Sequence, residues 1–221
     1  MQAAALIIAP YASPFDEEEG GNMNVIGLTG GIACGKSTVA GMLVQKGALL
    51  VDADRLSREA VEPGNQAWKE IIQWLGDAIV EEDGTLDRKK IASIVFNDEK
   101  SLAKLNSIIH PRVLDLFYQR SSELKKELPG RPLIWDIPLL FETGYDKRVD
   151  YIVVVASREE VQIQRLLARD GLSREEALRR IRSQLEIKKK IAKADFVICN
   201  NGTKDLLEEK VDLLWEKIQA I

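Results

Sequence analysis

The chain has 221 residues, a length that allows one sizeable hydrophobic core with at most a small appended subdomain. Its formal net charge of −4 gives no reason to expect a nucleic-acid partner. Two cysteines and one histidine cannot build a disulfide framework or a His/Cys zinc site, and no apolar run reaches the roughly 18 residues of a membrane span. We therefore expect a cytoplasmic protein without a membrane partner, and we assume a monomer, with a small oligomer as the alternative.

Residues 1–22 differ in composition from the rest of the chain. The apolar run at 3–8 has no basic residue before it, which argues against a signal peptide. The acidic run at 16–19 and the two glycines after it are typical of a solvated linker, and Met23 stands directly before the first predicted strand. We expect residues 1–22 to be a dispensable extension, with an ordered extension that packs on the domain as the alternative.

The most informative stretch is residues 30–37, Gly-Gly-Ile-Ala-Cys-Gly-Lys-Ser, which fits the phosphate-binding pattern G-x-x-x-x-G-K-[ST] at every fixed position. Glycines allow the backbone to bring its N–H groups close to an anion. Lys36 is expected to reach the β- and γ-phosphates, and the Ser37 hydroxyl to bind Mg²⁺. A short buried strand is predicted before the loop and a helix after it, whose positive end favours phosphate. A glycine-rich turn without a ligand is the alternative.

Cys34 lies inside this loop, close to backbone N–H groups, Lys36 and a helix N-terminus, all of which favour a thiolate. We therefore expect a reactive thiol that Mg-ATP protects. Cys199, at the end of a predicted buried strand, is expected to react more slowly.

Two aspartates follow the second predicted strand, the apolar run at 48–51. Ligands of open α/β sheets bind beyond the carboxyl ends of the strands, so Asp52 and Asp54 lie where chemistry is expected. Either one could instead cap the next helix, predicted at 55–61. Both interpretations stay open for each residue, although two aspartates beside a phosphate loop favour a functional role.

Residues 65–128 are predicted to be mostly helical. One helix ends near residue 108, and His110-Pro111 indicates a boundary because proline suits the first position of a new helix, which runs to about 128. This insertion between two strands is a candidate second-substrate domain, and a helical layer over the sheet is an equal alternative. At a helix start, His110 is expected to be structural more often than a ligand.

Three further strands are predicted, at 133–137, 151–155 and 194–200, before a closing helix at 205–220. Asp136 lies near the carboxyl end of the first of these strands, where a carboxylate can hold Mg²⁺ through water. Glu142 follows it as a further acid near the site. Five short apolar runs joined by helices predict an α/β fold with a parallel sheet.

The helical segment at 158–193 carries eleven Lys and Arg against six Asp and Glu. Arg165 and Arg169 share one helix face, and the pattern beginning at Ser173 is typical of a capping box. A basic helical hairpin after the fourth strand suits a lid that closes over phosphates. Most of these cations are expected to lie on a solvated face, and the lack of aromatic residues disfavours RNA binding.

Taken in order, these motifs resemble those of dephospho-coenzyme A kinases, a branch of the P-loop nucleotide kinases, from Met23 to the end. The resemblance is carried by the segments 28–38, 52–58, 62–64, 110–111, 138–142, 165–181 and 194–202. One departure is Ala33-Cys34, where the family commonly has Gly-Ser, so backbone freedom at residue 33 is reduced.

The resemblance implies an α/β fold with a P-loop kinase-type parallel five-stranded sheet flanked by helices. It also implies a helical coenzyme-binding insertion at about 65–128 and a helical lid at about 158–193. The implied reaction is the Mg²⁺- and ATP-dependent phosphorylation of the ribose 3′-hydroxyl of dephospho-coenzyme A, the last step of coenzyme A synthesis. Another P-loop nucleoside or nucleotide kinase and a non-enzymatic nucleotide-binding switch are the alternatives.

Residue roles follow from matching positions, and here the motif favours Asp54 over Asp52 as the general base. The expected catalytic residues are Asp54, Lys36 and Arg165. The expected ATP-binding residues are Ala33, Cys34, Gly35, Lys36, Ser37, Thr38, Arg169, Asn200 and Gly202. The expected acceptor-binding residues are Asp52, Arg58 and His110. Ser37 and Asp136 are the expected Mg²⁺ ligands.

Overall fold

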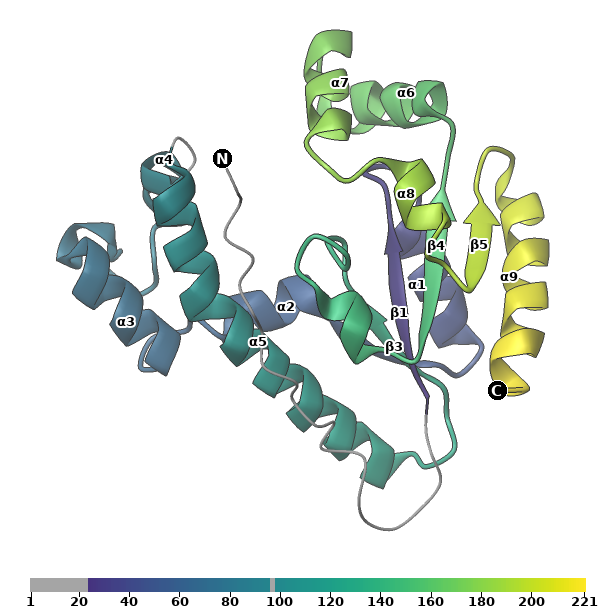
Figure 1. Ribbon diagram of the computed structural model, residues 1–221, viewed down its shortest axis with the longest axis horizontal. Coiled ribbons are helices and arrows are strands. Elements are labelled where there is room, and N and C mark those ends of the chain that lie inside the picture. The colour runs from purple at the N-terminus through teal and green to yellow at the C-terminus, as the bar shows by residue number, and fades with distance from the viewer. Residues whose placement is uncertain (1–23, 96–97) are drawn as a thin grey trace.

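The computed structural model describes residues 24–95 and 98–221, and the extension predicted at 1–22 lies outside this range. Five parallel strands form one sheet in the order β2-β3-β1-β4-β5 (Figure 1). The strands are β1 Val25–Gly30, β2 Leu49–Asp52, β3 Leu133–Asp136, β4 Tyr151–Ala156 and β5 Phe196–Cys199. The predicted fold class is thus confirmed.

The α-helices of the described residues are α1 Lys36–Gln45, α2 Ala53–Glu59, α3 Gln66–Leu75, α4 Arg88–Val95, α5 Glu99–Glu127, α6 Glu159–Asp170, α7 Arg174–Arg182, α8 Ile187–Ile191 and α9 Lys204–Gln219. Two short 3₁₀ helices, η1 Asp77–Ile79 and η2 Tyr145–Arg148, join them. No helix in residues 24–95 and 98–221 combines the length and the hydrophobicity needed to cross a bilayer.

The sheet is buried on both faces, as the continuous apolar sequence of β4 indicates. Side chains alternate between the faces of a strand, so Val153 and Val155 join the core under α1 and α9. Ile152 and Val154 join the opposite core, which α5 and α8 cover. The central position of β1 places its carboxyl end, and the loop that follows it, at the middle of the sheet.

One continuous helix, α5, replaces the two helices predicted on either side of His110-Pro111. The Asp98 carboxylate caps its start, and Pro111 lies inside it. An internal proline removes one helical hydrogen bond, but most helical stability in proteins comes from burial of an apolar face. The prediction of a boundary was wrong because both halves of α5 pack on a core, the first half on the insertion at Leu105 and the second on the sheet at Phe117.

The insertion has a small core of its own. Ile71, Ile79, Leu86, Ile91 and Val95 are its buried residues. They come from α3, η1, α4 and the turn between them, and they pack on the first half of α5. Figure 1 shows this part of the molecule standing apart from the sheet, on the side away from β5.

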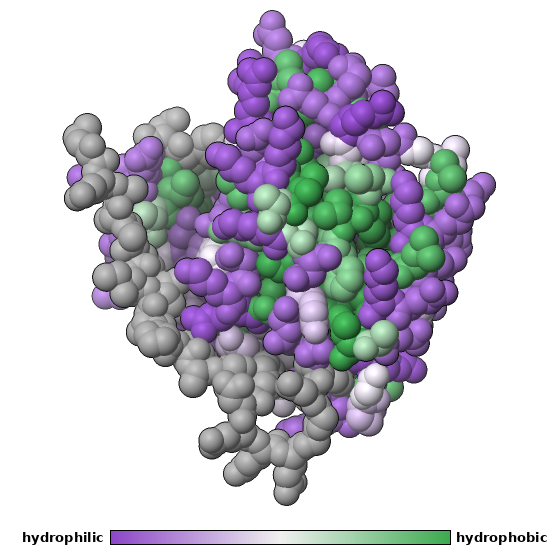
Figure 2. Space-filling model, turned by 45° about the vertical axis from the view of Figure 1, so that its right-hand side comes forward, coloured by the Kyte–Doolittle hydropathy of each residue, from purple (hydrophilic) through white to green (hydrophobic). Residues whose placement is uncertain are grey.

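The hairpin of α6 and α7 leaves the sheet after β4 and returns through α8 to β5 (Figure 1). The capping box predicted at Ser173 is present, because its hydroxyl accepts a hydrogen bond from the Glu176 N–H and the Glu176 carboxylate accepts one from the Ser173 N–H. Hydrophilic residues cover most of the projecting end (Figure 2). Arg174 and Arg180 pair there with Glu160 and Asp170, as expected of a solvated basic face.

A buried hydrogen bond ties α5 to the sheet: the Trp135 indole N–H donates to the Ser121 hydroxyl at 2.9 Å. We expect Ser121→Ala to lower the free energy of unfolding by about 1–3 kcal/mol, because it leaves a buried donor without a partner. Thermal denaturation would detect this as about 2–4 °C for each kcal/mol. Ser122→Ala, on the next, less buried position of α5, is the control, and equal melting temperatures for the two variants would contradict the prediction.

Candidate active site

The loop after β1 takes the backbone path that its glycines predict. Gly35 precedes α1 with φ 89°, in the left-handed region that favours glycine. A Cβ at this position would also collide with the side-chain amide of Asn200. Ala33 adopts φ 58°, the only positive φ of a non-glycine residue in the part of the chain that the structure describes. The chain thus adopts a left-handed conformation at residue 33, although this residue is not a glycine.

Three consecutive carbonyl groups of the loop accept hydrogen bonds from side chains outside it. The donors are Gln162 Nε2 to Ile32 O at 2.7 Å, Arg165 Nη1 to Ala33 O at 3.2 Å and Asn200 Nδ2 to Cys34 O at 2.9 Å. No described residue accepts a hydrogen bond from the N–H of Ala33 or Gly35. Lys36 and Ser37 begin α1, so their N–H groups lack intrahelical partners. The loop therefore has N–H groups available for an anion.

Lys36 forms an ion pair with Asp136, at the carboxyl end of β3. Both side chains are largely buried, and Asp136 is 5% exposed. Burial raises the pKa of the Asp136 carboxyl above its ordinary value, and the adjacent Lys36 ammonium opposes this rise. The pair places a cation and a carboxylate next to the phosphate loop.

The two aspartates after β2 have different positions. The Asp52 carboxylate accepts hydrogen bonds from the N–H groups of Asp54 and Arg55, at 2.7 and 3.1 Å, and caps α2. Asp54 is exposed and lies in the first turn of that helix. From the local sequence, either residue could cap the helix, and the structure shows that Asp52 is the cap.

A cavity of about 870 Å³ lies over the phosphate loop. All nine residues predicted to bind ATP line it, and so do Asp54 and Arg165. Asp136 is not among the lining residues, although its partner Lys36 is. Asp52 lines a separate cavity of about 340 Å³ between β2, α2 and α5.

The remaining predicted acceptor-binding residues do not line the main cavity. Arg58 is exposed near the end of α2, and His110 lies half-buried in the middle of α5, not at a helix start. The backbone carbonyl of His110 accepts a hydrogen bond from the Tyr145 hydroxyl at 2.8 Å. Burial lowers the pKa of the His110 imidazole, so the neutral form is favoured at pH 7.

The two lid arginines have different environments. Arg165 is half-buried and donates to the Ser157 hydroxyl and to both oxygens of Asn200, besides the loop carbonyl. Arg169 pairs with the neighbouring Asp170, and its side chain is 61% exposed. Arg165 supports the loop in this structure. Arg169 lines the cavity, and its surface ion pair contributes little free energy, so it breaks easily.

Sequence reasoning missed two glutamines that contact the loop. Besides the bond from Gln162, the Gln184 side-chain carbonyl accepts a hydrogen bond from the Ile32 N–H at 2.8 Å. Gln162 precedes Leu166 by four residues, and both are buried on one face of α6. A glutamine on an apolar helix face was the available signal; no comparable pattern marks Gln184.

The described residues contain no cluster of three or more His, Cys, Asp or Glu side chains suited to a metal ion. The Ser37 hydroxyl and the Asp136 carboxylate are oxygen ligands of the kind that Mg²⁺ prefers. Magnesium is commonly held by one or two protein oxygens together with substrate phosphates. The two residues therefore fit Mg²⁺ that binds with a nucleotide.

The structure contradicts the reasons for the expected reactivities of the two cysteines. The Cys34 side chain is fully buried in the core under α1 and α9, and this burial raises the pKa of its thiol above the ordinary value. Cys199 is exposed. The loop amides that favour a thiolate are outweighed because the Cys34 side chain points away from the cavity and into the core.

We accordingly expect a maleimide to label Cys199 much faster than Cys34 at pH 7–8. Peptide mass spectrometry of briefly labelled protein measures both rates, and Cys199→Ser isolates the slow site. Saturating ATP should change the Cys199 rate little. Fast labelling of Cys34 in the folded Cys199→Ser variant would show that the thiol faces solvent.

The sequence matches known proteins along most of the chain. A family model for dephospho-CoA kinase matches residues 24–205. A dephospho-CoA kinase of Geobacter sulfurreducens is 44% identical over 196 residues, which cover 88% of this chain and 98% of the relative. One of Fusobacterium nucleatum is 45% identical over 194 residues, with 88% and 98% covered.

Solved structures agree with these matches. A crystal structure from Thermus thermophilus has a TM-score of 0.75 at 36% identity and covers 88% of this chain and 97% of its own. A dephospho-CoA kinase from Campylobacter jejuni has a TM-score of 0.69 at 27% identity, with 89% and 98% covered. The resemblance inferred from the ordered motifs is confirmed, and the chain belongs to the dephospho-CoA kinase family.

Proposed function

We propose that the chain transfers the γ-phosphoryl group of ATP to the ribose 3′-hydroxyl of dephospho-coenzyme A, giving coenzyme A and ADP. One observation carries the proposal within this family. Available loop N–H groups, the Lys36 ammonium and the exposed Asp54 carboxylate meet on the wall of a single cavity. Phosphoryl transfer needs such positioning and charge neutralisation more than covalent catalysis.

The available loop N–H groups, those of Ala33, Gly35, Lys36 and Ser37, bind the phosphates of ATP, and the positive end of α1 adds to this attraction. Lys36 turns from Asp136 toward the β- and γ-phosphates, where its charge is neutralised by the nucleotide. This exchange leaves the Asp136 carboxylate available. Asn200 and Gly202, which also line the cavity, lie beside the adenine.

Ser37 and the released Asp136 would hold Mg²⁺, which neutralises charge that develops on the phosphates when it is bound. Asp54 accepts the proton of the acceptor hydroxyl or orients that hydroxyl toward the γ-phosphate. Its exposure leaves the carboxylate accessible to an incoming substrate. Asp52 supports Asp54 by capping the helix that carries it.

The insertion at 65–128 binds the coenzyme portion of the acceptor, with Arg58 and His110 on its side of the site. The lid at 158–193 closes over the phosphates and excludes water, so that ATP is not hydrolysed. Arg169 leaves its surface pair with Asp170 to contact phosphate.

Two free cysteines suit a cytoplasmic location for the reaction.

ATP consumption should depend on dephospho-coenzyme A. We expect ADP release in the presence of ATP, Mg²⁺ and this acceptor, with coenzyme A as the second product by mass spectrometry. Adenosine, AMP and UMP serve as competing acceptors. Turnover that is equal or greater with UMP or AMP would identify a nucleotide kinase instead, and ATP binding without any acceptor-dependent turnover would identify a binding switch.

Asp54 should be needed for turnover and not for folding. Because Asp52 is the helix cap, Asp54→Asn should change the melting temperature and the affinity for ATP little, while kcat falls roughly 10²–10⁴-fold for loss of a positioned base. Asp212→Asn, which breaks a surface pair with Lys46, is the control. Near-normal turnover of Asp54→Asn would remove this residue from the mechanism.

A further inference from the structure

The phosphate loop is held at Ile32 from two sides. The Ile32 N–H donates to the Gln184 side-chain carbonyl at 2.8 Å, and the Ile32 carbonyl accepts from the Gln162 side-chain amide at 2.7 Å. These groups belong to the two peptide planes that flank Ile32. Neither plane can rotate without breaking a side-chain hydrogen bond, and the second plane carries the N–H of Ala33.

The conformation that follows needs such support. Ala33 has φ 58°, and a non-glycine residue in the left-handed region carries backbone strain that persists only when its surroundings hold it. A rotation of the 32–33 peptide would relieve the strain and turn the Ala33 N–H out of the cavity. The glutamine contacts therefore maintain one of the available phosphate-binding N–H groups.

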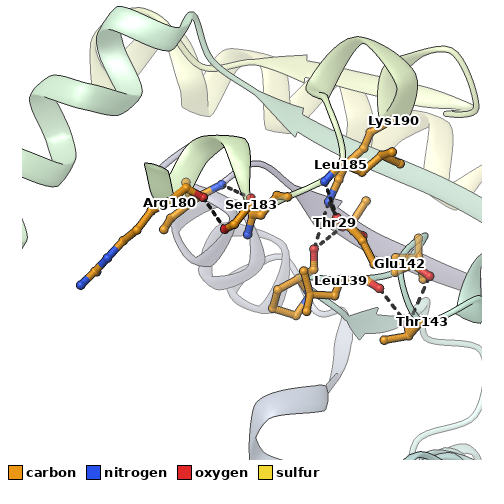
Figure 3. Close-up of polar contacts among 12 residues, drawn as sticks. Thr29, Leu139, Glu142, Thr143, Arg180, Ser183, Leu185 and Lys190 are labelled. Atoms are coloured by element: carbon orange, nitrogen blue, oxygen red, sulfur yellow. Dashed lines mark hydrogen bonds and ion pairs between the residues drawn. The ribbon is translucent and has the colours of Figure 1, made fainter. Parts of the chain in front are cut away.

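Gln184 lies where the lid rejoins the core. Gln184 follows the end of α7, where the Ser183 hydroxyl donates a hydrogen bond to the Arg180 carbonyl at 2.9 Å. The next N–H, of Leu185, donates to the Glu142 carboxylate at 3.0 Å. Figure 3 shows this junction between the end of α7 and the segment after β3.

Buried contacts fix the junction to the strand that enters the loop. The fully buried Lys190 pairs with Glu142 at 2.8 Å and donates to the Pro138 carbonyl at 3.4 Å. The same carbonyl accepts from the Thr29 hydroxyl at 3.0 Å, at the end of β1 (Figure 3). Glu142, expected from sequence to lie near the site, thus anchors the returning lid. A movement of α7 about this anchor changes the position of Gln184 relative to Ile32.

We propose that Gln184 is a positioning residue for phosphoryl transfer: it holds the phosphate loop in its nucleotide-binding shape and couples that shape to the lid. Its effect on catalysis rests on the proposed function. Its effect on the loop can be measured through ATP binding alone, without an acceptor. The effect on the loop and the effect on catalysis can therefore be tested separately.

The test is Gln184→Met, which keeps the length of the side chain and removes the acceptor. Calorimetric titration with Mg-ATP in the absence of acceptor should give a Kd about 3–10-fold higher, the loss that corresponds to one hydrogen bond. In the complete reaction, KM for ATP should rise by a similar factor while KM for dephospho-coenzyme A stays the same. The exposed Gln219→Met, at the far end of α9, is the matched control.

A double-mutant cycle with Gln162→Met tests whether both side chains act through Ile32. If they do, the double variant should weaken ATP binding by less than the product of the two single effects, because either loss already frees the loop. Effects that multiply, an unchanged Kd in folded Gln184→Met, or equal changes in both KM values would overturn the proposal. If Gln162→Met does not fold, the Gln184→Met titration decides alone. Tight ATP binding by the wild type with no turnover of dephospho-coenzyme A would refute the proposed function and leave this test intact.

Discussion

A loop that turns its N–H groups toward an anion must turn carbonyl groups the other way, and those carbonyls need donors. In this protein the donors for residues 32–34 are the side chains of Gln162, Arg165 and Asn200. Two of them come from α6 and the third from the end of β5, more than a hundred residues along the chain from the loop. The phosphate site is therefore a product of the whole sheet order, which brings β5 beside β4 and β4 beside β1.

This constraint also explains the double role of the lid. A helix that supports the loop from behind cannot at the same time move freely as a rigid cover. Arg165, with its guanidinium on the loop carbonyl and on Ser157, belongs to the supporting part. Arg169, four residues further and largely exposed, belongs to the part that is able to reach a bound nucleotide. The division between support and cover falls within α6 itself.

The fold and the outline of the site could be predicted because their signals are local. The pattern at 30–37, the apolar runs of the strands and the capping box at Ser173 each depend on a few neighbouring residues. Other features depend on contacts that no local pattern contains. The choice of Asp52 as the cap of α2, the burial of the Cys34 side chain and the glutamine contacts on Ile32 require the packed structure. Pro111 misled the prediction because its local preference was outweighed by burial of α5 on two cores.

The continuity of α5 has a mechanical consequence. Its 29 residues span about 44 Å, longer than the diameter of a small domain. Ile109, near its middle, packs against the core of the insertion and against the core of the sheet. Because two cores share this single rod, α5 contains no break at which one core could melt before the other. The insertion and the sheet should therefore unfold together on heating, and a change in the core of the insertion should lower the stability of the entire enzyme.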